Sequence, residues 1–222
     1  MTFSNKWETC YKNKTHSMNN WPFSDLVSYV MRFSKPGKSK IRVLELGCGS
    51  GANIPFFLSL NVEYFGIDGS NTIVRNLKKN PMLKNNIIVG DFTKELPFQK
   101  KFDLIVDRAS INHNPTNAIK KCLGLVHQQL KTNGKFIGID WFSTSDIGYK
   151  SGRKTNDVFT KSYVGGRYYG VSKIHFNNEK HLLDLFKNFK ILRLDEKIYK
   201  SIIPIENKTI AVWNIVAQKQ DF

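Results

Sequence analysis

The sequence predicts an α/β fold in which helices cover both faces of a doubly wound, mostly parallel sheet. Three observations lead to this prediction. Short runs rich in Val, Ile and Leu recur along the chain, they alternate with segments of helical length, and a glycine-rich turn follows the first of them. Apolar runs without alternation are typical of parallel strands that are buried on both faces. Their regular spacing favours right-handed crossovers within one sheet.

We expect a seven-stranded sheet whose last strand pair is antiparallel. The expected strands lie near residues 42–46, 63–67, 86–90, 102–107, 134–140, 189–197 and 208–218. The expected helices lie near residues 26–33, 52–60, 70–79, 116–131 and 179–187. Ser24 and Asp25 are candidate caps for the first of these helices, and Asn177 and Asn178 for the last.

The chain divides at about residue 40. Residues 1–40 carry Trp7, Tyr11 and Trp21 and are expected to form a helical arm that covers a cofactor site. The alternative is that these aromatic residues only pack the arm against the core. Residues 41–222 are expected to form the main domain, because 222 residues with 41% hydrophobic content suit one full core.

Composition excludes several classes of protein. No stretch of 18 apolar residues occurs and the first seven residues are too polar for a signal peptide, so we expect a cytoplasmic protein without a membrane span. Three cysteines without close spacing argue against a disulfide framework. The histidines share no metal-ligand spacing, and no metal is expected. A monomer and a dimer both stay open.

The net charge of +16 raises the possibility of a nucleic-acid partner. However, 27 of the 34 basic residues are Lys, and they are dispersed along the chain rather than grouped in long runs. This distribution lacks the Arg-rich character of bidentate phosphate recognition. The charge therefore favours a small anionic partner, and nucleic acid stays a weaker possibility.

The turn at Gly47, Gly49 and Gly51 is the most informative segment. Glycines permit close approach of the main chain to a ligand, and the next helix offers free N–H groups. Asp68 follows the second strand, 21 residues after Gly47, where a carboxylate accepts hydrogen bonds from ribose hydroxyls. The pattern Gly47-x-Gly49-x-x-Ala52 also fits a loose dinucleotide fingerprint.

Glu45 distinguishes between these ligands. A carboxylate two residues before Gly47 repels a pyrophosphate but attracts a ligand that carries an ammonium and a sulfonium. Asp91 and Phe92, after the third strand, suit an adenine: the carboxylate meets the exocyclic amine and the ring lies against the base. The ligand predicted from these residues is S-adenosyl-L-methionine, with S-adenosyl-L-homocysteine as product.

With these motifs the chain resembles the class I S-adenosylmethionine-dependent methyltransferases, a Rossmann-like superfamily. The resemblance rests on five ordered motifs, at residues 43–51, 66–70, 90–92, 102–107 and 130–136. It implies that Glu45, Gly47 and Gly49 face the methionine part, Asp68 the ribose, and Asp91 and Phe92 the adenine. It also implies that Asp107 begins the methyl-transfer segment. The other expected cofactor contacts are Cys48, Asn53, Gly69 and Ser70.

The segment after the fourth strand bears on the acceptor. It lacks the Asn/Asp-Pro-Pro-aromatic run that is usual in methyltransferases acting on amino groups of bases or glutamine. Residues 107–110, Asp-Arg-Ala-Ser, are similar to the Asp-Arg-Gly of thiopurine-type thiol methyltransferases, with Ala109 in place of Gly. We expect transfer to a hydroxyl, or a thiol, of a small anionic metabolite or sugar.

The expected catalytic residues are His113, Asp107 and Arg108, with His113 as an optional base and Arg108 as an anion contact. The alternatives are a surface histidine and a structural Asp107–Arg108 ion pair. Segment 141–177, rich in glycine and aromatic residues, is expected to be an acceptor-binding lid, or else an irregular hairpin packed on the sheet edge. Expected substrate contacts are Arg108, Trp141, Arg153, Arg167 and Tyr168.

Two other functions compete with methyl transfer to a small molecule. An RNA methyltransferase is favoured by the positive charge and disfavoured by the missing base-handling motif. A non-catalytic protein that binds S-adenosyl-L-methionine also stays open, because a fold does not determine turnover.

Overall fold

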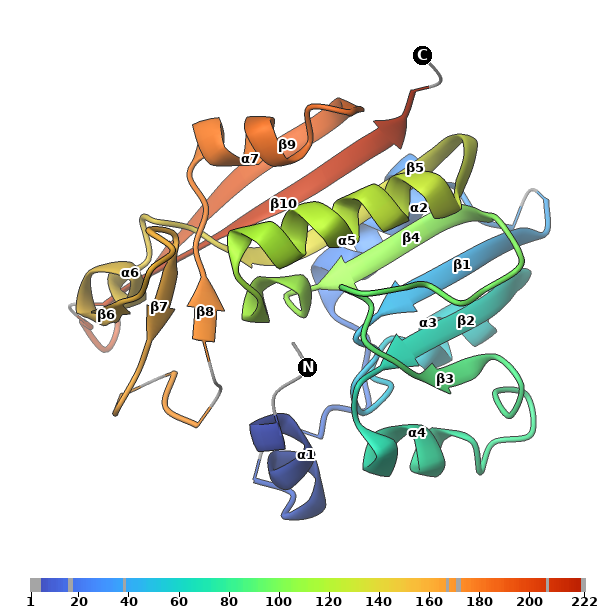
Figure 1. Ribbon diagram of the computed structural model, residues 1–222, viewed down its shortest axis with the longest axis horizontal. Coiled ribbons are helices and arrows are strands. Elements are labelled where there is room, and N and C mark those ends of the chain that lie inside the picture. The colour runs from blue at the N-terminus through green and yellow to red at the C-terminus, as the bar shows by residue number, and fades with distance from the viewer. Residues whose placement is uncertain are drawn as a thin grey trace.

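The computed structural model shows helices on both faces of one large sheet, with a small second sheet beside it (Figure 1). The structure describes residues 5–15, 18–37, 39–166, 168–170, 173–206 and 208–220. The helices are α1 (Asn5–Lys12), α2 (Ser24–Phe33), α3 (Ile54–Leu58), α4 (Asn71–Leu77), the 3-10 helix η1 (Ile111–His113), α5 (Thr116–Gln129), α6 (Ile147–Ser151) and α7 (Glu179–Leu185). The strands are β1 (Ile41–Leu46), β2 (Val62–Asp68), β3 (Ile87–Val89), β4 (Phe102–Arg108), β5 (Leu130–Phe142), β6 (Arg153–Lys154), β7 (Thr160–Ser162), β8 (Lys173–His175), β9 (Phe189–Lys200) and β10 (Thr209–Lys219).

The large sheet has the order β3-β2-β1-β4-β5-β10-β9. Strands β1 to β5 are parallel, and β10 is antiparallel to both β5 and β9. The seven-stranded Rossmann-like sheet with an antiparallel last pair is therefore confirmed. The strand order reverses beside β1, and β1 and β4 lie next to each other at the centre of the sheet.

Alternate residues of the central strands enter two separate cores. Val43 packs with α2, α3 and α4 on one face, whereas Leu44 packs with α5 and α7 on the other. Both side chains are fully buried, as expected for a strand covered on both faces. The site therefore rests on a sheet that is packed on both sides.

Of the two predicted helix caps, the cap of α7 is observed and the cap of α2 is not. Asn178 caps α7 as predicted, because its side chain accepts a hydrogen bond from the backbone N–H of His181. Ser24 and Asp25 do not cap α2, whose N-cap is Phe23. Asp25 instead accepts hydrogen bonds from Lys197 of β9 and Asn214 of β10, so the predicted cap was wrong because two distant strands bind this carboxylate.

The described residues of segment 141–177 contain regular secondary structure. They include the end of β5, helix α6 and the three-stranded antiparallel sheet β6-β7-β8. Tyr168, Ile174 and Phe176 form a small core of their own, and Asp157 accepts hydrogen bonds from Thr116 at the start of α5. Within the described part of the chain, no helix is long and apolar enough to cross a membrane.

Candidate active site

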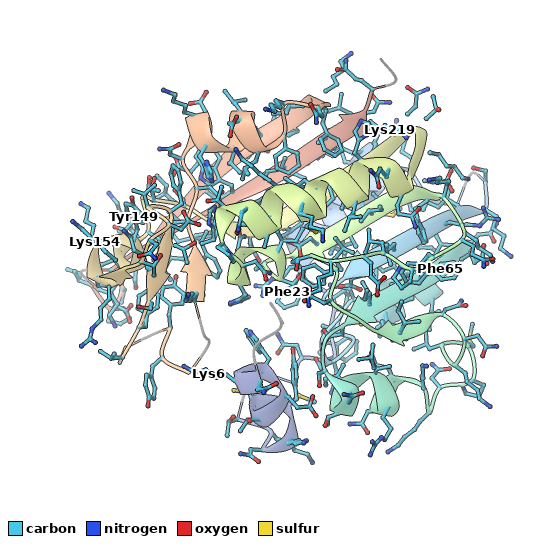
Figure 2. All side chains as sticks on the ribbon, viewed as in Figure 1. Lys6, Phe23, Phe65, Tyr149, Lys154 and Lys219 are labelled. Atoms are coloured by element: carbon cyan, nitrogen blue, oxygen red, sulfur yellow. The ribbon has the colours of Figure 1, made fainter. Side chains whose placement is uncertain are left out.

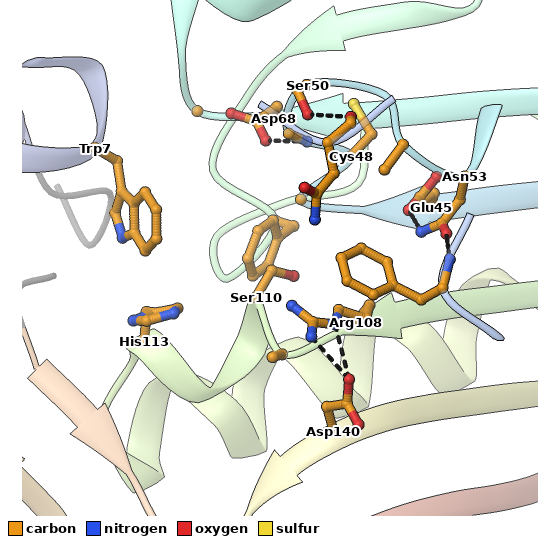
Figure 3. A pocket seen from close by; sticks show the side chains of 18 of the residues that line it. Trp7, Glu45, Cys48, Ser50, Asn53, Asp68, Arg108, Ser110, His113 and Asp140 are labelled. Carbon is orange, nitrogen blue, oxygen red and sulfur yellow. Dashed lines mark hydrogen bonds and ion pairs between the residues drawn. The ribbon is translucent and has the colours of Figure 1, made fainter. Parts of the chain in front are cut away.

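A cavity of about 640 Å³ opens at the carboxyl ends of the central strands. Residues from the ends of β1, β2, β4 and β5 line its floor, helix α1 lies across it, and the small sheet closes one side (Figures 1 and 3). The carboxyl edge beside a reversal of strand order is where open α/β sheets bind ligands.

The glycine turn forms a close backbone cradle at this edge. Gly47 and Gly49 have φ angles of +63° and +50°, which side chains rarely adopt. A Cβ added to Gly47 would lie 2.3 Å from the Cβ of Ser110, and one added to Gly49 would lie 3.2 Å from the hydroxyl of Tyr11. Both glycines are therefore required by their backbone geometry and their neighbours.

Asp68 holds this turn from the end of β2. One carboxylate oxygen accepts the Gly49 N–H at 2.9 Å, and the other accepts the Ser70 N–H at 2.8 Å. Asp68 is almost fully buried, and burial raises its pKa although both backbone hydrogen bonds lower it. Asp68 lines the cavity together with Cys48 and Gly69, two other expected cofactor contacts.

Glu45 lies at the opposite end of the turn, within a chain of hydrogen bonds. Its carboxylate accepts from the Tyr64 hydroxyl at 2.6 Å and from the Asn53 amide at 2.7 Å. The Asn53 carbonyl oxygen in turn accepts the backbone N–H of Phe23 at 3.1 Å (Figure 3). Burial raises the pKa of Glu45 to about 7, against the lowering effect of the two hydrogen bonds. A ligand cation near this carboxylate would favour its charged form.

Asp91 and Phe92 also line the cavity, after β3. Asp91 accepts hydrogen bonds from the backbone and hydroxyl of Thr93, which orient its carboxylate. Ser70 differs from the prediction because it does not line the cavity. Its hydroxyl accepts the Ile73 N–H as the cap of α4 and donates to Glu8 at 2.5 Å.

Helix α1 brings the N-terminal arm to the cavity. Glu8 accepts hydrogen bonds from Ser70 and Thr72 at the start of α4, and this places Trp7 and Tyr11 among the lining residues. Burial raises the pKa of Tyr11. The sequence did not indicate the role of Glu8, because its hydrogen-bond partners lie more than 60 residues away.

Arg108 and Asp140 form an ion pair on the floor of the cavity (Figure 3). Nε and Nη2 of Arg108 both lie 2.9 Å from Oδ2 of Asp140. The guanidinium carbon lies 3.8 Å from the ring centroid of Phe23, so an aromatic face supports the charged group. Ala109 and Asp140 both have positive φ angles, +55° and +57°, beside this pair.

Asp107 and Trp141 lie beneath the cavity rather than in it, which corrects two sequence expectations. Asp107 is fully buried and accepts hydrogen bonds from the Trp141 indole at 2.8 Å and from the backbone N–H groups of Ser110 and Ile111. Successive side chains of a strand point to opposite faces, so Arg108 and Asp140 face the cavity while their neighbours face the core. Asp107 therefore supports the η1 turn from beneath the cavity.

Of the remaining predicted residues, some line the cavity and others do not. His113 and Tyr168 line the cavity, and the His113 Nδ1 lies 3.3 Å from the carbonyl oxygen of Lys173. Arg153 is exposed on β6 and does not line it; the neighbouring Lys154 lies at the outer edge of the molecule (Figure 2). Arg167 lies outside the described residues.

Several lining residues come from segments that the sequence did not connect with the site. They belong to the β9-β10 hairpin: Tyr199, Ile210 and Val212. These positions carry no local motif. Only the pairing of β10 with β5 brings the hairpin to the cavity.

This fold and site define a nucleoside-binding α/β protein of methyltransferase type. The methyltransferase domain family matches residues 37–171, more than half of the chain, and the chain belongs to this family. It is an S-adenosyl-L-methionine-dependent methyltransferase. The comparison with curated proteins finds no match.

Solved structures share the fold at low sequence identity. An S-adenosylmethionine-dependent methyltransferase from Methanosarcina mazei is 16% identical, with a TM-score of 0.66 over 90% of this chain and 98% of that one. The 1,6-didemethyltoxoflavin-N1-methyltransferase of Burkholderia thailandensis is 15% identical, with a TM-score of 0.69 over 98% and 87%. The magnesium protoporphyrin IX methyltransferase of Synechocystis is 16% identical, with a TM-score of 0.58 over 88% and 80%.

The residues of the cavity fit this cofactor. Gly47 and Gly49 line the cavity without side chains, as expected where a ligand approaches the main chain. Glu45 would hold the cationic methionine end, Asp68 the ribose hydroxyls, and Asp91 with Phe92 the adenine. Of the cofactor contacts predicted from the sequence, only Ser70 and Asp107 lie outside the cavity lining.

Proposed function

We propose that this protein transfers a methyl group from S-adenosyl-L-methionine to a hydroxyl, or a thiol, of a small anionic acceptor. One observation carries the proposal. A single cavity is lined both by the cofactor residues around Asp68 and Glu45 and by a second group with acid-base and anion-binding chemistry, His113 and Arg108. Cofactor and acceptor would therefore share one cavity, and their alignment alone would supply much of the rate.

When bound, S-adenosyl-L-methionine supplies a methyl carbon whose transfer to an acceptor oxygen breaks the C–S bond, leaves the electron pair on sulfur and releases a proton. His113 is the residue we assign to this proton. Its Nδ1 faces the carbonyl oxygen of Lys173, and a carbonyl only accepts hydrogen bonds. Nδ1 therefore carries the hydrogen of the neutral ring, and Nε2 carries the lone pair that a base needs.

Two features support an anionic acceptor. The net charge of +16 attracts anions to the protein, and Arg108 is a cation on the cavity floor. Nη1 of Arg108 makes no hydrogen bond within the described part of the chain, so it can donate to an acceptor while Nε and Nη2 stay on Asp140. The two neighbours named for 1,6-didemethyltoxoflavin and magnesium protoporphyrin IX support a small molecule as acceptor.

Release of S-adenosyl-L-homocysteine from fractionated metabolite pools tests the function. We expect one acidic fraction to support release, and Asp68→Ala to abolish it while weakening cofactor binding by about 2 kcal/mol or more. Asp184→Ala, on the exposed side of α7, is the matched control and should change neither. Tight cofactor binding without release from any pool would indicate a non-catalytic protein, and release only with RNA would indicate an RNA methyltransferase.

His113→Gln tests the base. We expect a large loss of kcat, no change in cofactor affinity, and disappearance of the acidic limb of the pH profile, because the protonated imidazole cannot accept the proton. His127→Gln is a suitable control, since His127 lies on α5, away from the cavity, and packs against Phe189 of β9. An unchanged pH profile in His113→Gln would leave positioning as the sole source of rate.

A further inference from the structure

Four aromatic rings form a continuous wall on the acceptor side of the cavity. Trp7 meets His113 at a centroid distance of 4.9 Å, His113 meets Phe142 at 6.3 Å, and Phe142 meets Tyr168 at 5.5 Å. The interplanar angles are 77°, 78° and 81°, so each ring stands edge-on to the next. All four residues line the cavity.

The wall joins four separate parts of the fold. Trp7 comes from α1, His113 from η1, Phe142 from the end of β5 and Tyr168 from the segment between β7 and β8. Its rings are held in place from behind. The Tyr168 hydroxyl donates to Asp146 at 3.1 Å, and Phe142 also packs on Phe176, which is fully buried. A wall supported in this way presents fixed ring faces and edges to a ligand.

The rest of this side of the cavity is largely apolar, with Ile174, Ile210 and Val212 in its lining. The Arg108–Asp140 pair with Phe23 behind it supplies the charge, and Asn114 and Tyr199 are the further polar side chains. Such a lining favours a flat apolar body with a polar group at one end. It suits a sugar poorly, because a sugar needs hydrogen-bond partners on several sides.

We infer that the acceptor is a planar aromatic or heteroaromatic ring that carries an ionisable hydroxyl and an acidic group. This inference rests on the proposed function and narrows its acceptor. The ring would lie along the wall, where offset and edge-to-face contacts favour aromatic partners. The acidic group would meet Arg108, and the hydroxyl would face His113.

The chemistry of the base agrees with a ring hydroxyl. A phenolic hydroxyl has a pKa of about 10, far closer to the ordinary histidine value of about 6.5 than the much higher pKa of an aliphatic hydroxyl. Proton transfer to His113 is therefore much less unfavourable from a phenol than from an aliphatic alcohol. The sugar included in the sequence-based expectation is the less suitable acceptor on both grounds.

Matched pairs of flat and puckered probes test the inference directly. The probes are 4-hydroxybenzoate with 4-hydroxycyclohexanecarboxylate, and phenol with cyclohexanol. Calorimetry is carried out with S-adenosyl-L-homocysteine present. We expect the aromatic member of each pair to bind at least about fivefold more tightly, because only a planar ring gains the aromatic contacts. Equal affinity within both pairs, or no binding of either aromatic probe, would overturn the inference.

Substitutions then locate the preference. Phe142→Leu should remove most of the discrimination within each pair, and Trp7→Ala, on a helix with no fully buried residue, should reduce it without affecting the core. Phe98→Leu is the control, since this ring packs on Phe65 and Phe102 rather than in the cavity. Discrimination that survives both wall variants would contradict a role of the wall.

The same measurements separate this inference from the proposed function. If a metabolite pool supports release of S-adenosyl-L-homocysteine by the enzyme but no aromatic probe binds, the methyltransferase function stands and the ring acceptor is wrong. If aromatic probes bind with the expected preference but no pool supports release, the aromatic site stands and the catalytic proposal fails. Binding is measured without turnover, so each claim has its own readout.

Discussion

Glu8 accepts a hydrogen bond of 2.5 Å from the hydroxyl of Ser70, and through this contact the N-terminal helix is attached to the cofactor site. Its second oxygen accepts from the Thr72 hydroxyl at 2.6 Å. Burial opposes ionisation of Glu8, but these hydrogen bonds outweigh it and lower the pKa of the carboxyl. Ser70 follows Asp68 by two residues, so one short segment holds the glycine turn, caps α4 and binds α1.

Glu8→Ala should therefore release helix α1 from the site. We expect cofactor affinity to fall by up to about 30-fold, since two hydrogen bonds to a carboxylate each contribute about 1 kcal/mol and Trp7 and Tyr11 lose their positions. The melting temperature should change little, because no residue of α1 is fully buried. Lys12→Ala, which removes only an exposed neighbour of Glu8, is the control. A large loss of stability in Glu8→Ala would make α1 part of the core instead.

The contrast between Glu8 and the strands shows what the sequence could predict. Each of the five parallel strands was expected within a few residues of its observed position, because each contains a run of apolar residues that are mostly buried. Asp68 and the glycine turn were found because they follow a strand end directly. Glu8 has no such local signal, since its role depends on a contact with a helix 62 residues away.

The side of a strand on which a residue lies was a second source of error. Trp141 was expected in the cavity, but its neighbour Asp140 faces the cavity and Trp141 donates to Asp107 in the core. A buried strand without alternation does not reveal which residues face which side. Which face each side chain takes depends on the packing of helices on both faces. At Asp140 the positive φ also changes the local direction of the backbone.

Cofactor affinity should depend on pH through Glu45, whose burial raises its pKa to about 7. Because this folded value lies above the ordinary 4.5, ionisation of Glu45 costs the folded protein free energy. This cost is absent below pH 4.5, where Glu45 is protonated, and complete above about pH 7, where it is ionised. A bound cation favours the charged carboxylate, so affinity should rise up to about tenfold from pH 5.5 to 7.5, with proton release on binding at the lower pH.

Glu45→Gln provides the control for this pH dependence. The amide cannot ionise, so affinity should be lower at pH 7.5 and nearly flat over the same range. Burial also raises the pKa of Asp107, to about 6, but this residue does not line the cavity. Calorimetry in two buffers of different ionisation enthalpy measures the proton release. An unchanged slope in Glu45→Gln would assign the effect to Asp107 or another group.

Gly47→Ala should abolish cofactor binding and reduce stability. The new Cβ would lie 2.3 Å from the Cβ of Ser110, and a non-glycine residue at φ +63° costs about 1–2 kcal/mol by itself. Gly124→Ala is the matched control. Gly124 lies in α5, and its Cβ would meet no atom within 4 Å. It should stabilise the protein by about 1 kcal/mol in denaturant unfolding, without an effect on the cofactor. Normal binding by Gly47→Ala would show that the turn can move away.

Arg108→Ala should separate acceptor binding from cofactor binding. Loss of a charged donor on the cavity floor should raise the KM for an acidic acceptor about tenfold, while the Kd for S-adenosyl-L-methionine stays within about twofold. Arg153→Ala is the control: this arginine was expected to bind the acceptor, but it is exposed on β6 and should leave both constants unchanged. Arg108 also packs on Phe23, whose backbone N–H reaches Glu45 through Asn53. Equal losses of both affinities in Arg108→Ala would therefore mean that this chain of contacts couples the two ends of the cavity.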